Sequence, residues 1–303
     1  MASLKAIRKR ITSVKSTLKI TKAMKMVAGA RLARAQQRIV SLRPYAVKTQ
    51  EILQSVADSL RQEGEEGSES SGNALHPLLV ERPEKNVLFL VMTGDRGLCG
   101  GFNTNVSKAT YAAWQEKVSA GADVKFATVG RKGREYIARR GGDVVQDFVR
   151  LYDGLDMDKS RTVSQWLVNR FQKGEFDAVY LTFNEFKSPL TQKPTVVKLL
   201  PLPKHEPAEE AKNAQGKAEF LFEPNPKALL ERLVPMYIEI SIFRALLETQ
   251  AGFFGAQMTA MDSATRNAKQ AIDRLTLLYN RGRQAAITKE LMEIVGGAEA
   301  LKE

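Results

Sequence analysis

The sequence predicts an α/β protein in which two long terminal helices form an antiparallel coiled coil with an α/β domain between them. Apolar repeats with helical spacing, one at each end of the chain, predict the coiled coil. An alternation of short β-rich and amphipathic segments predicts a parallel sheet covered by helices. The expected divisions are an N-terminal shaft helix (1–60), a flexible loop (61–80), the α/β domain (81–225) and a C-terminal shaft helix (226–303).

The N-terminal segment carries the whole excess of positive charge. The first acidic residue is Glu51, and 13 Lys or Arg residues precede it. The chain has 46 basic residues, so the other 33 balance its 34 acidic residues and the net charge of +12 belongs to this segment. We therefore expect the segment to lie against a negatively charged partner.

The same segment has an apolar stripe with spacings of three and four, which predicts one helix of about 50 residues or more. At about 1.5 Å per residue this helix would be about 75 Å long and would need a partner helix. Ser3 is the expected N-cap, the stripe changes phase near Thr21, and an interruption or bend is expected at most near Pro44. The stripe consists of Leu4, Ile7, Ile11, Val14 and Leu18, followed by Met24, Ala28, Leu32, Ala35, Ile39 and Leu42.

The C-terminal region supplies the expected partner helix. It contains no proline after Pro235. The two helices bracket about 200 residues, which favours an antiparallel pair, although two ordinary amphipathic helices in a larger bundle are an alternative. The predicted seam is Met261, Thr265, Ala268, Ile272, Leu275, Tyr279, Gly282 and Ala286, and a neighbouring stripe continues through Ile287, Leu291, Ile294, Ala298 and Leu301.

The region between the terminal helices alternates between strand and helix patterns. Two polar stretches, 61–74 and 203–217, are expected to be loops. The predicted strands are 87–93, 124–129, 144–149, 178–183, 195–200 and 219–223, and the predicted helices are 104–118, 132–140 and 159–171.

A glycine-rich turn, residues 94–103, follows the first predicted strand. Its glycines fit neither GxxxxGK[ST] nor GxGxxG, and no lysine follows them, so nucleotide binding is not expected. They are expected instead to provide tight backbone angles and close packing. The single cysteine and two histidines, Cys99, His76 and His205, do not make a zinc site of the usual kind. We expect no catalytic, cofactor or metal site in this chain.

Composition also limits the cellular setting. One cysteine excludes an internal disulfide and suits a reducing compartment. No apolar run approaches the roughly 20 residues needed to span a bilayer. The basic N-terminus is similar to a mitochondrial transit peptide, but its apolar repeat continues beyond the point where a removed peptide would end.

Three strings resemble the gamma subunit of the rotary proton-translocating ATP synthase, in the same order from end to end. The resemblance implies a Rossmann-like α/β domain on the antiparallel coiled coil. It further implies a non-catalytic rotor shaft inside a ring of alpha and beta subunits, with the epsilon subunit and the membrane ring of c subunits at the globular domain. The strings are KAIRKRITSVKSTLKITKAMKMVAGARLARAQ (5–36), TGDRGLCGGFNTN (93–105) and MDSATRNAKQAIDRLTLLYNRGRQAAITKELMEIVGGAEAL (261–301).

The resemblance also implies contact residues for the alpha and beta subunits. In this family the beta subunits carry acidic loops that face the shaft, and a basic helix complements them. Met24 with Lys22 and Lys25 resembles the torque-sensitive cluster of the family, and Lys9 is a further expected contact on the basic helix. The expected contacts at the other end are Arg283, Gln284, Thr288 and Glu290, with Ile294 and Leu301 in the apolar tip.

The segment 251–258, AGFFGAQM, departs from the usual family pattern because it lacks an acid and an arginine. Gly252 and Gly255 are expected to loosen the helix there, and Phe253 and Phe254 to offer apolar surface to a partner. Gly282 replaces a common alanine of the family.

Two other functions remain open on the residues alone. A basic stripe also fits phosphate, so a nucleic-acid-binding coiled coil is an alternative, although residues 1–44 lack interleaved aromatic residues. A membrane-surface helix is another alternative, but the stripe lacks Trp or Phe anchors. The resemblance, together with the absence of a presequence, implies a peripheral protein on the cytoplasmic side of a bacterial plasma membrane.

Overall fold

The computed structural model describes residues 3–65, 76–202 and 225–300. The chain divides into two compact units, one made of Met1–Ala30 with Gln257–Glu303 and the other of Arg31–Ala256. We call them the coiled-coil unit and the α/β unit. Helices α1 (Leu4–Glu65) and α5 (Pro226–Ala300) each contribute residues to both units. The predicted divisions at residues 60 and 226 therefore follow the helices rather than the compact units.

Both terminal helices are long and continuous. Helix α1 has 62 residues and continues through Pro44 without a break, and α5 has 75 residues and includes Pro235. Ser3 caps α1 as predicted, because its Oγ accepts a hydrogen bond of 3.2 Å from the amide of Ala6. Helix α1 ends at Glu65, inside the predicted loop 61–80. That loop region also contains a short 3-10 helix, η2 (Pro77–Leu79), whereas residues 66–75 lie outside the described part of the chain.

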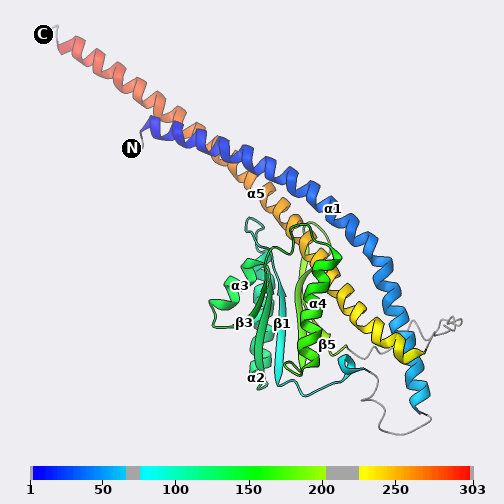
Figure 1. The fold of residues 1–303 in the computed structure, drawn as a ribbon. Coiled ribbons are helices and arrows are strands. Elements are labelled where there is room, and N and C mark those ends of the chain that lie inside the picture. The colour runs from blue at the N-terminus through cyan, green and yellow to red at the C-terminus, as the bar shows by residue number, and fades with distance from the viewer. Residues whose placement is uncertain (1–2, 66–75, 203–224, 301–303) are drawn as a thin grey trace. The chain divides into compact units, whose positions relative to one another are not determined.

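Five strands of the α/β unit form one sheet in the order β3-β2-β1-β4-β5 (Figure 1). The central strand β1 (Asn86–Met92) pairs in parallel with β2 (Asp123–Val129) and with β4 (Ala178–Phe186). Strand β3 (Asp143–Phe148) extends the parallel sheet beyond β2. Strand β5 (Gln192–Leu200) is antiparallel to β4, because only a short turn joins the two strands.

The predicted parallel sheet is thus confirmed for four strands, and β5 forms the hairpin edge. The remaining strand candidate, 219–223, and the predicted loop 203–217 lie outside the described residues.

Helices α2 (Phe102–Ser119), α3 (Arg131–Ala138) and α4 (Met157–Gln172) connect the parallel strands and form layers on the two faces of the sheet. Side chains of β1 point alternately to opposite faces, as expected for a strand. Phe89 packs on the side of α2 and α3, with Trp114 and Ile137. Leu90 belongs to the larger core on the other face, which α4 and α5 complete through residues such as Leu167 and Leu246. In the part of the chain that the structure describes, no helix is long and apolar enough to cross a membrane.

A charged cluster fastens the β5 edge of the sheet. The Glu84 carboxylate lies 2.7 Å from Lys117 Nζ and 2.8 Å from Lys198 Nζ, and the Tyr180 hydroxyl donates to it at 3.0 Å. Burial by itself would raise the pKa of Glu84, but hydrogen bonds from Lys117, Lys198 and Tyr180 outweigh burial and lower that pKa to about 2. The cluster joins the segment before β1 to α2, β4 and β5.

Candidate functional site

The coiled-coil unit pairs α1 with α5 in antiparallel orientation (Figure 1). A Cβ atom added to Gly282 would lie 3.0 Å from Leu4 Cδ2, and one added to Gly29 would lie 3.5 Å from Met258 Sδ. Residue numbers therefore fall along α5 as they rise along α1, which confirms the predicted antiparallel coiled coil. The positions on α5 between 275 and 286 that are half-buried are Leu275, Tyr279, Gly282 and Ala286, as the repeat predicted, and the others in this range are exposed.

A polar pair lies where the apolar stripe of α1 changes phase. Thr21 is buried, and its Oγ1 is hydrogen-bonded to Thr265 Oγ1 at 2.9 Å. Both hydroxyls also lie within hydrogen-bond distance of a carbonyl on their own helix. The seam therefore continues through Thr21, with a hydrogen bond between the helices in place of an apolar contact.

Lys25 is engaged by α5. Its Nζ lies 2.5 Å from Asp262 Oδ1, and Asp262 also pairs with Arg266 one turn further along α5. The hydrogen bond from Lys25 is the main cause that lowers the pKa of Asp262. Lys22 is exposed, and among the described residues no ion pair involves it. The two neighbouring lysines thus differ in how freely their charges can meet a partner protein.

The other expected contact residues lie at two levels of the coiled coil. Lys9 is exposed, and Met24 is half-buried beside the seam. Arg283, Gln284, Thr288 and Glu290 are all exposed on α5, and the Thr288 hydroxyl donates to the Gln284 carbonyl at 3.0 Å. Because Gly282 lies beside Leu4 whereas Asp262 lies beside Lys25, about 30 Å of helix separates the Met24 level from the Arg283 level.

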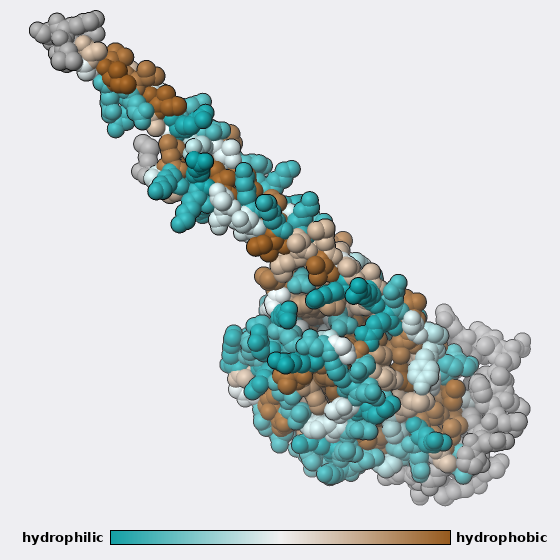
Figure 2. Space-filling model, turned by 45° about the horizontal axis from the view of Figure 1, so that its top comes forward, coloured by the Kyte–Doolittle hydropathy of each residue, from teal (hydrophilic) through white to brown (hydrophobic). Residues whose placement is uncertain are grey.

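The end of α5 extends past its contact with α1. Beyond Ala286 its described side chains are exposed, including Ile287, Leu291, Met292, Ile294 and Val295. Figure 2 shows brown, apolar side chains gathered toward this end of the helical rod. Ile294 is 69% exposed, while the second predicted tip residue, Leu301, lies outside the described residues. The described part of the tip presents an apolar surface without a partner helix.

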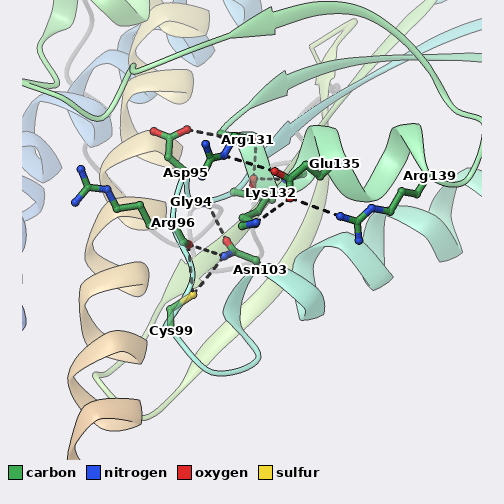
Figure 3. A network of polar contacts seen from close by, with 12 residues as sticks. Gly94, Asp95, Arg96, Cys99, Asn103, Arg131, Lys132, Glu135 and Arg139 are labelled. Carbon is green, nitrogen blue, oxygen red and sulfur yellow. Dashed lines mark hydrogen bonds and ion pairs between the residues drawn. The ribbon is translucent and has the colours of Figure 1, made fainter. Parts of the chain in front are cut away.

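The glycine-rich turn after β1 is held together by one side chain. Asn103 Oδ1 accepts from the amide of Gly94 at 2.8 Å, and Asn103 Nδ2 donates to the carbonyl of Arg96 at 3.1 Å (Figure 3). The same Nδ2 lies 3.3 Å from Cys99 Sγ, and burial raises the pKa of the Cys99 thiol. The backbone is left-handed at Gly100, with φ of +58°, as a tight turn requires.

The amides that begin α3 bind protein acceptors from the same turn. Arg131 N donates to Asp95 Oδ1 at 3.1 Å, Lys132 N to the Gly94 carbonyl at 3.3 Å, and Gly133 N to Thr93 Oγ1 at 2.7 Å. A phosphate at a helix N-terminus would need such amides free. A cavity of about 310 Å³ lies beside the turn, and its lining includes Arg31, Asp95 and Arg96. This arrangement is that of a packed structural turn.

Sequence reasoning missed several residues that organise these surfaces: Asp262, Asn103 and the Thr21–Thr265 pair. Asp262 could have been noticed because it lies four residues before Arg266, which is ion-pair spacing on a helix. Thr265 is a predicted seam position and Thr21 marks the change of phase, so their pairing could have been considered. Asn103 had no comparable signal, since its partners are backbone groups placed by the turn.

These features define a class of protein in which two long terminal helices pair as an antiparallel coiled coil with exposed charges, and a five-stranded α/β domain lies between them in the sequence. The profile of the ATP synthase family matches residues 3–301. The ATP synthase gamma chain of Sorangium cellulosum (strain So ce56) is 53% identical over 324 residues, and that of Desulforamulus reducens is 48% identical over 302 residues, each covering 100% of both chains. The chain therefore belongs to the ATP synthase gamma chain family, and nothing favours the nucleic-acid alternative.

Solved structures agree on the fold. A chain in the Euglena gracilis mitochondrial ATP synthase structure of OSCP, F1 and c-ring matches with a TM-score of 0.64 at 16% identity, covering 98% of this chain and 94% of that one. A chain of the Tetrahymena thermophila central stalk and c-ring structure matches with a TM-score of 0.58 at 20% identity, covering 81% and 99%. The Rossmann-like α/β domain on a long antiparallel coiled coil is thus a fold shared with these chains.

Proposed function

We propose that this chain is the central rotor shaft of a proton-translocating ATP synthase. It is a non-catalytic subunit that couples ion flow through the membrane c-ring to ATP synthesis or hydrolysis on the beta subunits. Its partners are the alpha and beta subunits, the epsilon subunit and the c-ring. The observation that carries this proposal is a coiled coil whose solvent-facing N-terminal helix has no acidic residue before Glu51, in a chain that matches gamma chains over its whole length.

The charged surface suits a contact that must form and break during rotation. Lys9 and Lys22 are exposed, so attraction to acidic loops of beta would be long-range and unspecific. Exposed ion pairs contribute only about 0–1 kcal/mol each. Contacts this weak would guide the shaft without locking it at one angle.

The proposed contacts divide by chemistry. Met24, Lys22 and Lys25 would meet beta on the basic helix, and Arg283, Gln284, Thr288 and Glu290 would meet it at the second level of the coiled coil. Ile294 and the tip around Leu301 would turn in an apolar sleeve as a bearing, because apolar contact is non-directional. We further propose that the protein is peripheral, on the cytoplasmic side of a bacterial plasma membrane.

Assembly tests the rotor proposal directly. The tagged chain, expressed with the alpha, beta, epsilon and c subunits of its own complex and purified in mild detergent, should recover all of them at fixed ratio. Lys22→Glu should weaken coupling of hydrolysis to ion pumping, whereas Lys173→Glu, at the exposed C-cap residue of α4, should not. Recovery of this chain without alpha and beta would overturn the assignment.

Met24→Lys tests the contact cluster rather than assembly. The new ammonium would join Lys22 and would also compete for Asp262, which now holds Lys25. We expect normal subunit recovery with impaired ion pumping per ATP hydrolysed, measured in membrane vesicles. A Met24→Lys complex that pumps like the parent would remove Met24 from the proposed contacts.

A further inference from the structure

We propose that residues Ala251–Ala256 clamp α5 to the loops at the carboxyl ends of β1 and β4, and that this α5 clamp is the joint through which torque passes between α5 and the sheet. The proposal rests on the rotor function proposed above. It reverses the sequence-based expectation for Gly252 and Gly255, which do not loosen the helix, since α5 is continuous through both. All residues of the α5 clamp and its partners belong to the α/β unit.

At the two glycines of the α5 clamp, the backbone of α5 lies as close to other segments as packing allows. A Cβ atom on Gly252 would lie 2.9 Å from Phe102 Cε2, at the start of α2. A Cβ atom on Gly255 would lie 3.1 Å from Pro189 Cα, in the turn between β4 and β5. Both glycines are buried. Any larger side chain would separate α5 from one of these loops, so the glycines act by permitting contact.

The phenylalanines of the α5 clamp interlock with the glycine turn. A Cβ atom on Gly94 would lie only 2.7 Å from Phe253 Cδ2, so the Phe253 ring occupies the space that any other residue at 94 would fill. Phe253 packs edge-to-face on Phe102 with ring centres 5.9 Å apart, and on Phe254 at 5.7 Å. The Arg31 guanidinium of α1 lies over the Phe254 ring at 5.8 Å. Phe253 and Phe254 therefore pack against other residues of this chain, whereas the sequence predicted that they would offer apolar surface to a partner.

The turn that receives Phe253 is rigidly connected to the sheet. Asn103 ties Gly94 to the rest of the turn, and the α3 amides bind Thr93, Gly94 and Asp95 (Figure 3). Thr93 N in turn donates to the Val129 carbonyl at the end of β2 at 2.8 Å. A sideways force on Phe253 is thus transmitted to β1, β2 and α3 through short, directional contacts.

Chain connectivity explains why the α5 clamp should bear torque. Ala256 is the last residue of α5 in the α/β unit, so a twist that arrives along α5 from residue 257 onward first meets the sheet at Gly252–Gly255. Earlier in α5, buried residues such as Leu246 pack in the large apolar core, where contacts are numerous but non-directional. An interlocked ring and glycine resist rotation about the helix axis more directly.

Gly94→Ala in the complete complex, reconstituted in vesicles, tests the α5 clamp, with Gly97→Ala as the matched control. Gly97 lies in the same turn, and a Cβ atom there would meet nothing within 4 Å. Neither glycine has a positive φ, so alanine fits the backbone at both positions. We expect Gly94→Ala to lower ions pumped per ATP hydrolysed by at least about twofold, with subunit recovery unchanged, and Gly97→Ala to have no effect.

A second substitution at Phe253 distinguishes loss of the α5 clamp from a general folding defect. Phe253→Leu alone removes the interlock without a clash and should also lower the pumping ratio, while Gly94→Ala with Phe253→Leu should pump better than Gly94→Ala alone. If Gly94→Ala prevents assembly, the number of ions pumped per ATP hydrolysed by the Phe253→Leu complex tests the α5 clamp instead. A parental pumping ratio in both single variants, or an equal loss in Gly97→Ala, overturns the α5 clamp. Because the parent complex is measured alongside, failure of the rotor proposal would appear separately as a parent that neither assembles nor pumps.

Discussion

The two units of this chain bury their side chains in contrasting ways. In the α/β unit, β1 is fully enclosed from Val87 to Met92, and Phe89 stacks between Phe126 and Tyr180 with ring centres 5.9 and 5.3 Å away. In the coiled-coil unit, burial is confined to a narrow seam. The described residues buried there are Ile7, Thr21, Ala28, Met261 and Ala268, which are mostly small or polar.

This contrast shows how one chain can combine self-sufficient stability with a surface for other proteins. The α/β unit has large apolar side chains on both faces of its sheet and can exclude water by itself. The coiled-coil unit has only one line of contact between two helices, so most of its surface remains available. We expect the coiled-coil unit to depend on seam length and on surrounding subunits, and the α/β unit to depend on its own core.

Shortening the seam should have the largest effect. Deleting residues 275–303 removes Leu275, Tyr279, Gly282 and Ala286 and leaves the first turns of α1 without a partner, so a stable complex should not form. Deleting only residues 297–303 should preserve assembly and much of the ATP hydrolysis rate, because among the described residues of α5 the contact with α1 already ends at Ala286. Subunit recovery and ATP synthesis in vesicles measure both. If the short deletion abolishes assembly and synthesis and the long one is no worse, the tip makes specific contacts and is not a bearing.

Truncating a large side chain in the core beside the sheet should have the next largest effect on stability, and only in the α/β unit. Phe89→Ala should lower the free energy of unfolding of that unit by about 3–5 kcal/mol. Ile11→Ala, at a half-buried seam position, should cost about 1–2 kcal/mol in the coiled-coil unit.

Tryptophan fluorescence can separate the two units during urea unfolding. Trp114 and Trp166 are the two tryptophans of the chain, and both belong to the α/β unit. Phe89→Ala should therefore shift the fluorescence transition, while Ile11→Ala should shift only the early loss of helical circular dichroism. An equal shift of the fluorescence transition by Ile11→Ala would mean that the units unfold together.

The Glu84 cluster should make the stability of the α/β unit depend on pH in the acidic range. The pKa of Glu84 in the folded protein is about 2, below its ordinary value of 4.5. The stabilisation is therefore complete above pH 4.5 and is lost as pH falls from 4.5 toward 2. Glu84→Gln should cost about 1–2 kcal/mol at pH 7 once solvent screening is included, and the difference from the parent should vanish near pH 2.

An exposed carboxylate on α2, the helix that carries Lys117, provides the control for Glu84. Glu116 precedes Lys117 on α2 and is exposed, so Glu116→Gln should change the unfolding free energy by less than about 0.5 kcal/mol. Fluorescence-detected urea unfolding at several pH values measures both variants. A loss in Glu84→Gln that is the same at pH 3 and pH 7 would contradict the assigned cause.

The threonine pair in the seam should have the smallest effect. Thr21→Val removes the hydrogen bond to Thr265 and the one to the Leu18 carbonyl of the same helix. The Thr265 hydroxyl can still donate to the Met261 carbonyl, so the cost should be below about 1 kcal/mol. Replacing both threonines by valine should be neutral or slightly stabilising, because the pair then becomes an apolar contact. Thermal loss of helical circular dichroism measures these changes. A cost above about 2 kcal/mol for the single change would show that the Thr265 hydroxyl depends on Thr21.

Much of the coiled coil could be predicted because its signal is local. Positions three or four apart lie on one face of a helix, so the order of apolar residues predicted the seam through Gly282 and Ala286. The strands of the sheet were predicted for the same reason, since β1 is an uninterrupted apolar segment between turn signals. The family resemblance then supplied the expected contact surface, including Lys22 and Met24.

The role of the glycines in 251–258 could not be predicted from their neighbours. Helix propensity treats Gly252 and Gly255 as weak points. Their partners, Phe102 and Pro189, are far away in the sequence, and only their approach to α5 makes a missing side chain useful. The ion pair of Lys25 could not be predicted for the same reason. Its partner Asp262 is distant in the sequence and is brought beside Lys25 by the pairing of the helices.

The sequence by itself determined two long helices, the strands between them and an N-terminal helix that carries the excess positive charge, because periodicity and charge are properties of neighbouring residues. Tertiary structure alone decided that residues 31–65 and 226–256 belong with the sheet, that β5 is antiparallel, and that Phe253 fills the space beside Gly94. These outcomes depend on contact distances between segments far apart in the chain. Such distances follow from how whole surfaces pack, and no local pattern encodes them.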